Sequence, residues 1–188
     1  MPARKSTRNI KYLTDEELQR LFAVITSPRD RAIFRLAYHR GLRASEVGML
    51  QLSDYRAAAG RLHVRRLKNG YSGEYGLTDA ETKALRVWLK ERGDAPGSIF
   101  ISNRKTPISQ QMLDVLMKRY CLKARIPNDK AHFHSLRHSC ATGMLERGED
   151  IAVVQDHLGH ANIANTAIYA KITNKRRDEV AKRLKNWR

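Results

Sequence analysis

AHFHSLRHSCATGMLERGEDIAVVQDHLGHANIANTAIYAK, residues 131–171, is the stretch around which the rest of the chain is organised. His134 and Arg137 are three residues apart, so a helix that begins near Ser135 would bring both side chains to one anion. A guanidinium binds phosphate through paired hydrogen bonds, and an imidazole adds a donor or moves a proton near neutral pH. Tyr169 supplies an oxygen nucleophile that can form a covalent intermediate. The stretch therefore predicts a DNA strand-transfer site.

A second histidine of this stretch follows a predicted helix end. Asp150 is expected to cap a helix over 151–158, and Gly159 is expected to end it. His160 would then emerge at a turn.

Composition restricts the class of partner. The 188 residues suit one domain, and 36 Lys plus Arg against 19 Asp plus Glu give a net charge of +17. This charge favours nucleic acid, because binding would release the counterions that surround a polyanion. No apolar run is long enough to cross a membrane and no signal peptide precedes the basic amino terminus, which predicts a cytoplasmic protein. Cys121 and Cys140 are expected to be buried free thiols.

Capping signals and periodicity predict the fold class. Helices are expected after capping residues, and their apolar residues recur at helical spacing. The expected capping residues are Thr14, Ser27, Thr78, Ser109 and Asp150. Between Leu52 and Thr78 the apolar pattern alternates, which is typical of a small antiparallel sheet. The sequence therefore predicts a mainly α protein with a small antiparallel β-sheet, an α+β fold.

Gly-Leu-Arg-Ala-Ser-Glu at 41–46 offers a second phosphate clamp. Arg43 follows the predicted end of a helix, and Glu46 could hold the arginine in place through a charge-assisted hydrogen bond. An arginine and a glutamate three residues apart also form ordinary surface ion pairs, and that alternative stays open for these two residues alone.

Basic residues outside the motifs are candidates for DNA contacts. Lys68 would lie at the tip of a hairpin, where its ammonium could donate a proton in a substrate groove; a merely solvated basic hairpin is the alternative. An arm over 1–13 could follow the phosphates or only aid solubility. The candidate DNA-binding residues are Arg4, Lys5, Arg8, Arg65, Arg66, Arg104 and Lys105.

The motifs at 41–46 and 134–138, the Leu-Gly-His turn at 158–160 and Tyr169 occur in a fixed order. Together they resemble the catalytic domain of the tyrosine recombinase (phage integrase) family, and the resemblance runs from about residue 14 to residue 185. Four linked motifs are much more specific than any one of them.

The resemblance implies a role for each motif residue. Arg43 and Arg137 would bind the non-bridging oxygens of the scissile phosphate, and Tyr169 would attack the phosphorus. Lys68 would protonate the leaving 5′ oxygen, and His134 would assist proton transfer.

His160 would hydrogen-bond the phosphate, and Glu46 would be the supporting acidic residue. Because the cations offset the developing charge, the implied reaction forms a 3′-phosphotyrosine without metal, cofactor or ATP. The implied partners are double-stranded DNA, further copies of the chain in a synaptic tetramer, and an accessory DNA-bending or directionality factor. A bacterial or phage protein associated with the nucleoid is expected.

The domain plan departs from the family in one respect. We expect a basic arm over 1–13, a catalytic domain over 14–173 and a tail helix over 174–188 that docks on another protomer or on its own domain. By this plan we expect no room for the family's amino-terminal core-binding domain. Short recombinases that resemble the fimbrial phase-variation enzymes fit this plan better than a fragment of a longer integrase.

Three different functions compete with this prediction: a metalloenzyme, a type IB topoisomerase, which reseals the same strand, and a DNA-binding regulator without catalysis. For the metalloenzyme, His134 and His138 have HxxxH spacing, but Ser135 stands where metallopeptidases place a glutamate. No metal site is therefore expected, and His132, His138 and His157 are interpreted as packed or hydrogen-bonded residues.

Overall fold

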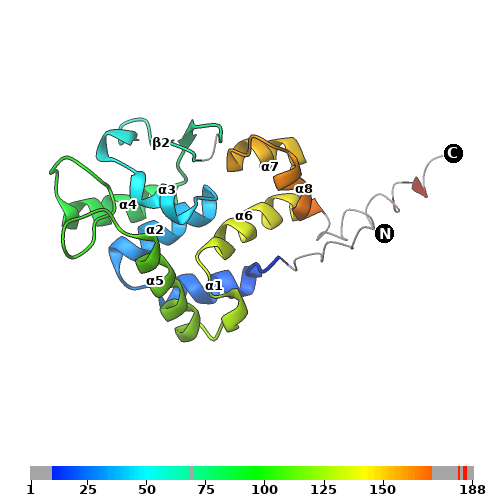
Figure 1. Cartoon of the computed structure of the whole chain (residues 1–188), viewed down its shortest axis with the longest axis horizontal. Coiled ribbons are helices and arrows are strands. Elements are labelled where there is room, and N and C mark those ends of the chain that lie inside the picture. The colour runs from blue at the N-terminus through cyan, green and yellow to red at the C-terminus, as the bar shows by residue number, and fades with distance from the viewer. Residues whose placement is uncertain (1–9, 68–69, 171–181, 183, 186–188) are drawn as a thin grey trace, which may run out of the picture.

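Helices form most of the computed structural model, which describes residues 10–67, 70–170, 182 and 184–185 (Figure 1). The longer helices are α1 (Asp15–Val24), α2 (Pro28–His39), α4 (Asp79–Arg92), α5 (Gln110–Lys123), α6 (His134–Glu146) and α7 (Ile151–Leu158). The shorter ones are α3 (Ala44–Met49), α8 (Ala164–Ala170), and the 3-10 helices η1 (Leu52–Asp54) and η2 (Asn128–Lys130). The strands are β1 (Tyr55–Arg56), β2 (Arg61–Val64) and β3 (Gly73–Gly76). The predicted fold class is confirmed.

The predicted capping residues begin the helices. Thr14 accepts a hydrogen bond from the Glu17 backbone N–H at 3.3 Å, and Glu17 accepts one from the Thr14 N–H at 2.8 Å. Thr78 starts α4 with the same reciprocal pair, and Gly159 ends α7 in the left-handed conformation. These bonds satisfy amide groups that would otherwise lack partners at a helix end. Local signals in the sequence therefore placed the helix ends correctly.

The three strands form one antiparallel sheet in the order β1, β2, β3. Leu62 pairs with Tyr75, and the side chains of Leu62 and Val64 are fully buried while that of His63 between them is not. This alternation is the period of two that a sheet with one buried face requires. Of the β2–β3 connection, Lys68 and Asn69 lie outside the described residues.

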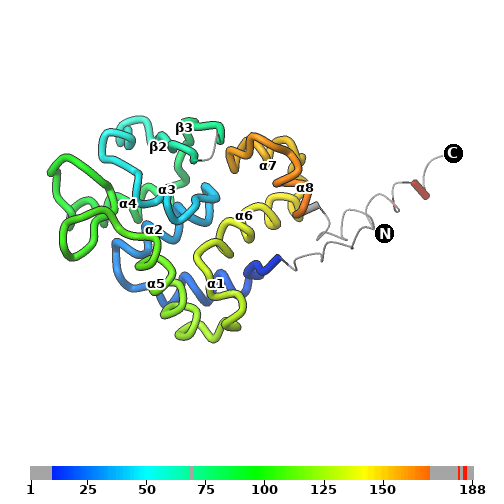
Figure 2. Tube along the Cα trace, in the orientation of Figure 1, coloured from blue at the N-terminus to red at the C-terminus, as the bar shows by residue number. Residues whose placement is uncertain are grey.

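Helix α6 lies between the helices α1, α2 and α5 on one side and α7 and α8 on the other (Figures 1 and 2). On one side it packs against α2, which also packs against α4, and the large core extends from there to α1 and α5. On the other side α6 packs against α7 and α8, where a smaller cluster contains Cys140, Leu158 and Tyr169. Helix α6 therefore contacts both the large core and the two helices, α7 and α8, that follow it in the chain.

The predicted arm is described only from residue 10 onward. Leu13 belongs to the core and its N–H donates to the Ser139 hydroxyl on α6 at 2.8 Å, while Lys11 pairs with Asp129 at 2.6 Å. Packing thus begins before the predicted boundary at residue 13. Arg4, Lys5 and Arg8, and nearly all of the predicted tail helix over 174–188, lie outside the described residues.

Candidate active site

Arg137 joins two of the motifs through its guanidinium. Its side chain points inward from α6, with 1% of the residue exposed. One terminal nitrogen donates to the Gly41 carbonyl and the other donates to the Leu158 carbonyl at 2.8 Å. The turn after α2 and the end of α7 are therefore held together by one charged group.

Gly41 has little room for any other residue type. Its φ of +55° is in the region that favours glycine, and an added Cβ would meet the Leu158 side chain at 2.3 Å. The close approach of these two segments brings both carbonyls within reach of Arg137.

Glu46 connects the second clamp to the hairpin. Its carboxylate accepts from the Arg43 guanidinium at 2.6 Å and from the Arg66 guanidinium at 2.9 Å. It also accepts the backbone N–H of Arg43 at 2.9 Å and that of Leu67 at 3.4 Å. A buried carboxylate with these four donors is not a surface ion pair, so the alternative for Arg43 and Glu46 is excluded.

The structure corrects the prediction for Arg66. Its side chain is fully buried, and its terminal nitrogens donate to Glu46, to the Arg40 carbonyl at 2.8 Å, to the Tyr75 hydroxyl at 3.0 Å and to the His157 carbonyl at 2.8 Å. Because its two terminal nitrogens already donate to these four acceptors, this guanidinium is used within the fold and not in a DNA contact. Arg66 instead ties the hairpin to α2, α3 and α7.

The other predicted DNA contacts that are described lie at the surface. Arg65 is exposed, although its guanidinium forms a two-bond pair with Asp54 at 2.9 and 2.7 Å. Arg104 and Lys105 are exposed in the loop between the short bridge at Ile101 and helix α5. These three side chains remain accessible to a polyanion.

The hairpin that contains Lys68 approaches the site through the described residues on both sides of that lysine. The Leu67 N–H faces Glu46, and an added Cβ on Gly70 would lie 2.5 Å from the Gly159 carbonyl oxygen. The position of Lys68 itself lies outside the described residues.

His160 is fixed by a bond that the sequence did not indicate. The residue is 6% exposed, and its Nδ1 lies 2.8 Å from the Thr166 hydroxyl, at the start of α8. The Gln155 side chain donates to the His160 carbonyl at 2.9 Å. The turn after α7 is thus attached to the helix that carries Tyr169.

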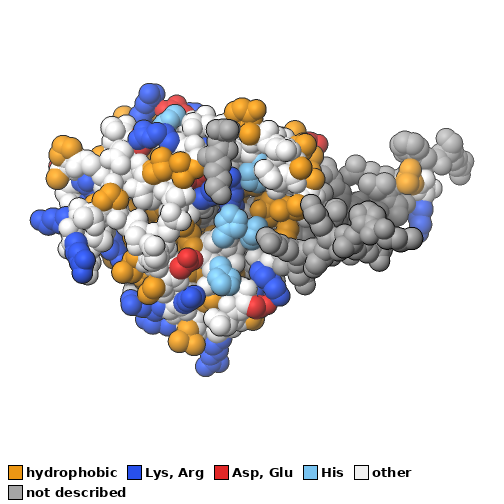
Figure 3. Space-filling model, viewed as in Figure 1, with side chains coloured by type: hydrophobic (Ala, Val, Ile, Leu, Met, Phe, Trp, Pro, Cys, Tyr) orange, Lys and Arg blue, Asp and Glu red, His pale blue; other side chains and the backbone are white. Residues whose placement is uncertain are grey.

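Tyr169 contacts His138, a histidine for which the sequence predicted no catalytic role. Its hydroxyl lies 2.8 Å from Nδ1 of His138, whereas His134 is exposed one turn earlier on α6. The rings of His134 and His138 pack edge to face with centroids 4.5 Å apart. Figure 3 shows histidine side chains gathered over α6 and α7 on one face of the molecule.

Burial and neighbouring charges set the protonation states of Arg137 and Glu46. Burial lowers the pKa of Arg137 to about 10, assisted by the charges of Arg43 and Arg66, so the guanidinium stays charged at neutral pH. Burial opposes ionisation of Glu46, but the Arg66 charge and the bonds from Arg43 outweigh it and lower the pKa of Glu46. Three guanidiniums around one carboxylate leave a net positive site that would bind an anion.

The neutral forms dominate among the titratable rings. Burial, followed by the charges of Arg137 and Arg43, lowers the pKa of His160 to about 4, and the same causes lower the pKa of His134. Burial raises the pKa of Tyr169 to about 12. At neutral pH the phenol therefore keeps its proton.

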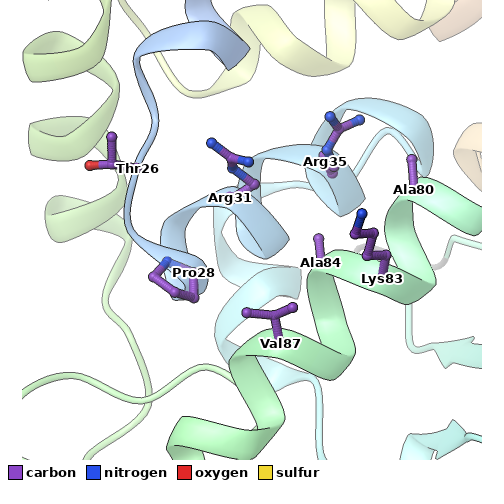
Figure 4. Close-up of a pocket in the computed structure, with 8 residues that line it drawn as sticks. All are labelled: Thr26, Pro28, Arg31, Arg35, Ala80, Lys83, Ala84 and Val87. Carbon is purple, nitrogen blue, oxygen red and sulfur yellow. The ribbon is translucent and has the colours of Figure 1, made fainter.

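A separate groove of about 420 Å³ lies between α2 and α4 (Figure 4). Its lining includes Arg31, Arg35 and Lys83, but Arg31 already donates to the Ile25 carbonyl and Arg35 lies over the Phe22 ring at 5.2 Å. None of the motif residues lines this groove, so it is not the candidate site.

Metal ligands do not gather anywhere in the described chain. Within ranges 10–67 and 70–170, no three His, Cys, Asp or Glu side chains are grouped to hold a metal ion. No helix in the described part of the chain has the length and apolar character to span a bilayer. Cys121 and Cys140 are buried and free, as predicted.

Three residues of the site have roles that the sequence did not predict: His138, Thr166 and Arg66. His138 was interpreted only as a packed or hydrogen-bonded residue. The one available signal was its place directly after Arg137, which puts it on the same helix as the clamp but does not reveal a partner 31 residues away.

The chain matches the model of the phage integrase family over residues 11–176. It is 36% identical over 168 residues to the type 1 fimbriae regulatory protein FimE of Escherichia coli strain K12, which covers 85% of this chain and 84% of that protein.

Solved structures agree with this match. The crystal structure of XerA recombinase superimposes with a TM-score of 0.82 at 27% identity, covering 100% of this chain and 68% of that one. The XerH site-specific recombinase bound to its palindromic difH substrate, in a post-cleavage complex, has the same fold with a TM-score of 0.78 at 23% identity, covering 92% of this chain and 52% of that one.

Proposed function

The chain belongs to the phage integrase family of tyrosine recombinases, and we propose that Tyr169 is the nucleophile with which it carries out site-specific DNA recombination. One observation supports this assignment above the others. Helix α6 carries Arg137, which joins the carbonyls of Gly41 and Leu158, and on the next residue it carries His138, which meets the Tyr169 hydroxyl. Motifs separated by more than 100 residues thus converge beside one phenol.

Arg43 and Arg137 would bind the non-bridging oxygens of the scissile phosphate. As the tyrosine oxygen attacks, negative charge grows on these oxygens, and fixed guanidiniums stabilise it without reorganisation. Glu46 would keep Arg43 in place, because it already accepts two hydrogen bonds from that residue. His160, fixed by Thr166, would donate to the same phosphate.

The products would be a 3′-phosphotyrosyl bond and a free 5′ hydroxyl. Lys68 would protonate the leaving oxygen; the approach of Leu67 and Gly70 to the site supports this role. Because the phosphotyrosine keeps the energy of the broken phosphodiester, a 5′ hydroxyl from another strand would reverse the step without ATP. Cutting and joining would then be one reversible exchange that needs neither metal nor cofactor.

DNA contacts outside the site would come from exposed cations. Arg65, Arg104 and Lys105 are accessible in the structure, and Arg4, Lys5 and Arg8 would add contacts from the arm. We further propose that four protomers assemble on two DNA sites, that the segment over 174–188 docks between protomers, and that an accessory DNA-bending factor sets direction. The protein would work in the cytoplasm, associated with the nucleoid.

A suicide substrate tests the proposal directly. Nicked duplexes from the flanks of the protein's own gene, mixed with the protein in EDTA, should give a protein–DNA adduct that survives SDS. Tyr169→Phe should bind the DNA with nearly unchanged affinity and give no adduct. An adduct that persists in Tyr169→Phe would show that another residue is the nucleophile.

The same preparation distinguishes a recombinase from a topoisomerase and from a regulator. Relaxation of supercoiled plasmid without exchange between two sites would indicate a topoisomerase, and binding without an adduct on any flank would indicate a regulator. Exchange of strands between two duplexes is the result expected of a recombinase.

A further inference from the structure

His138 occupies a place that the roles above leave unexplained. Its Nδ1 lies 2.8 Å from the Tyr169 hydroxyl, the ring centroids are 5.5 Å apart, and the ring planes are inclined by 56°. His134, the histidine to which the family resemblance gives proton transfer, is exposed, and its ring packs nearly perpendicular to that of His138. The imidazole beside the reacting oxygen is therefore that of His138.

The charge state of His138 suits a proton acceptor. Burial lowers the pKa of this imidazole to about 4, and the neighbouring His134, Arg137 and His160 lower it further. At neutral pH the ring is then uncharged and has one nitrogen with a free lone pair. Since Tyr169 keeps its proton, the phenol can donate to that nitrogen.

We propose that His138 accepts the Tyr169 proton when the phenol oxygen attacks the phosphate, an inference that rests on the proposed role of Tyr169 as nucleophile. The bond between the tyrosine oxygen and phosphorus forms as the bond between phosphorus and the 5′ oxygen breaks. The phenol proton passes to Nδ1 of His138, and the leaving oxygen takes its proton from the separate donor, Lys68. In the joining step His138 returns the proton to the phenolate, so His138 ends unchanged.

Substrate binding would make this transfer easier. In the free protein a proton on His138 is disfavoured by three neighbouring cationic or ionisable groups, two on α6 and His160 at the turn after α7. A phosphate bound beside Arg137 adds negative charge close to the same ring and offsets that repulsion. The His138 imidazole thus becomes more basic when the phosphate is bound, and the Tyr169 phenol stays protonated when no phosphate is bound.

The first test measures single-turnover cleavage of the suicide substrate. His138→Phe should cleave about 10²- to 10⁴-fold more slowly, as for the loss of a general base. His138→Gln keeps a hydrogen-bond acceptor for the phenol but cannot take the proton, so it should be comparably slow. The matched control is His132→Phe, which alters an exposed histidine two residues before α6 and should cleave at the wild-type rate.

A tyrosine of lower pKa provides a readout that a structural role would not change. Trifluorotyrosine at position 169 should raise the cleavage rate of His138→Phe at least ten-fold, because an already acidic phenol needs no proton acceptor. The same replacement in a protein that keeps His138 should change the cleavage rate much less. Wild-type cleavage by His138→Gln would overturn the proposal and make His138 a positioning residue. Equal effects of fluorination with and without His138 would overturn it as well.

Nitrogen-15 NMR of the DNA-free protein tests the same proposal without catalysis. The His138 ring should be neutral at pH 7, with its proton on Nε2 and a free Nδ1. A proton found on Nδ1 would overturn the proposal, even if no DNA substrate were found. Absence of any wild-type adduct, in contrast, would count against the proposed function and leave the NMR result to decide the role of His138.

Discussion

Arg66→Met should destabilise the fold far more than Arg65→Met, although the two arginines are adjacent in sequence. The Arg66 side chain is fully buried and pairs with Glu46 at 2.9 Å, whereas the Arg65 side chain is 43% exposed and pairs with Asp54 at 2.7 Å. Removing one partner of a buried ion pair costs about 3–5 kcal/mol, while an exposed pair contributes about 1 kcal/mol at most. Methionine fills a similar volume in both cases, so the comparison isolates the charged group.

The contacts of Arg66 set the size of the expected loss. Besides Glu46, the backbone carbonyls of Arg40 and His157 and the hydroxyl of Tyr75 would each lose a donor at 2.8 to 3.0 Å. Against this, removal of one cation relieves repulsion with Arg43 and Arg137, and Glu46 keeps its bonds from Arg43. We therefore expect a loss of about 3 kcal/mol, at the lower end of the range for a broken buried pair.

Urea and thermal unfolding of the two variants measure this difference. For a chain of this size, about 3 kcal/mol corresponds to a fall in Tm of roughly 6–12 °C for Arg66→Met, with a change of about 4 °C or less for Arg65→Met. Arg65→Met should instead weaken DNA binding and reduce the salt slope of the binding constant by about one. Equal unfolding midpoints for the two variants would refute this account of Arg66.

Three further predictions concern other contacts of the fold and the site. Gly41→Ala should lower the free energy of unfolding by at least about 2 kcal/mol more than Gly60→Ala in urea titrations, because both have positive φ but only the first Cβ meets a neighbour. Burial opposes ionisation of Glu81, but hydrogen bonds from His39 and Arg40 and the Arg40 charge outweigh it and lower the pKa of Glu81 from 4.5 to about 2. Glu81 should therefore add about 3 kcal/mol of stability above pH 4.5 that is lost as the pH falls toward 2, and the unfolding of Glu81→Gln should match that of the wild type at low pH only. Thr166→Val should slow adduct formation about ten-fold while Tm falls by only roughly 2–4 °C, the cost of one hydrogen bond of about 1 kcal/mol, because His160 loses its hydrogen-bond partner; a wild-type rate would count against this role.

The neighbours Arg65 and Arg66 show where sequence reasoning stopped. Both stand in one basic run after β2, and nothing in their spacing distinguishes a residue that faces solvent from one that faces Glu46. The strand alternation ends at Val64, so the period of two gives no orientation beyond it. Only the approach of α3 and α7 to the hairpin decides which guanidinium is enclosed.

The histidines show the same limit. HxxR spacing indicated that His134 and Arg137 share a helix face, but the structure leaves His134 exposed and turns Arg137 inward. The contact of His138 with Tyr169 depends on how α8 packs on α6, and that packing has no local signature. Sequence reasoning therefore named the reacting groups but paired the tyrosine with no particular histidine.

The sequence by itself determined the helix ends, the small sheet, the family and the residue types of the site. Capping boxes, apolar periods and motif spacings act between residues a few positions apart, and such interactions can be read from the order of residues alone. The tertiary structure decided that Arg66 is a buried link, that Arg137 bridges Gly41 and Leu158, and that His138 meets Tyr169. These contacts join residues 20 to 96 positions apart, and they exist only because the packing of α6 against its neighbours fixes the distance and direction of each side chain.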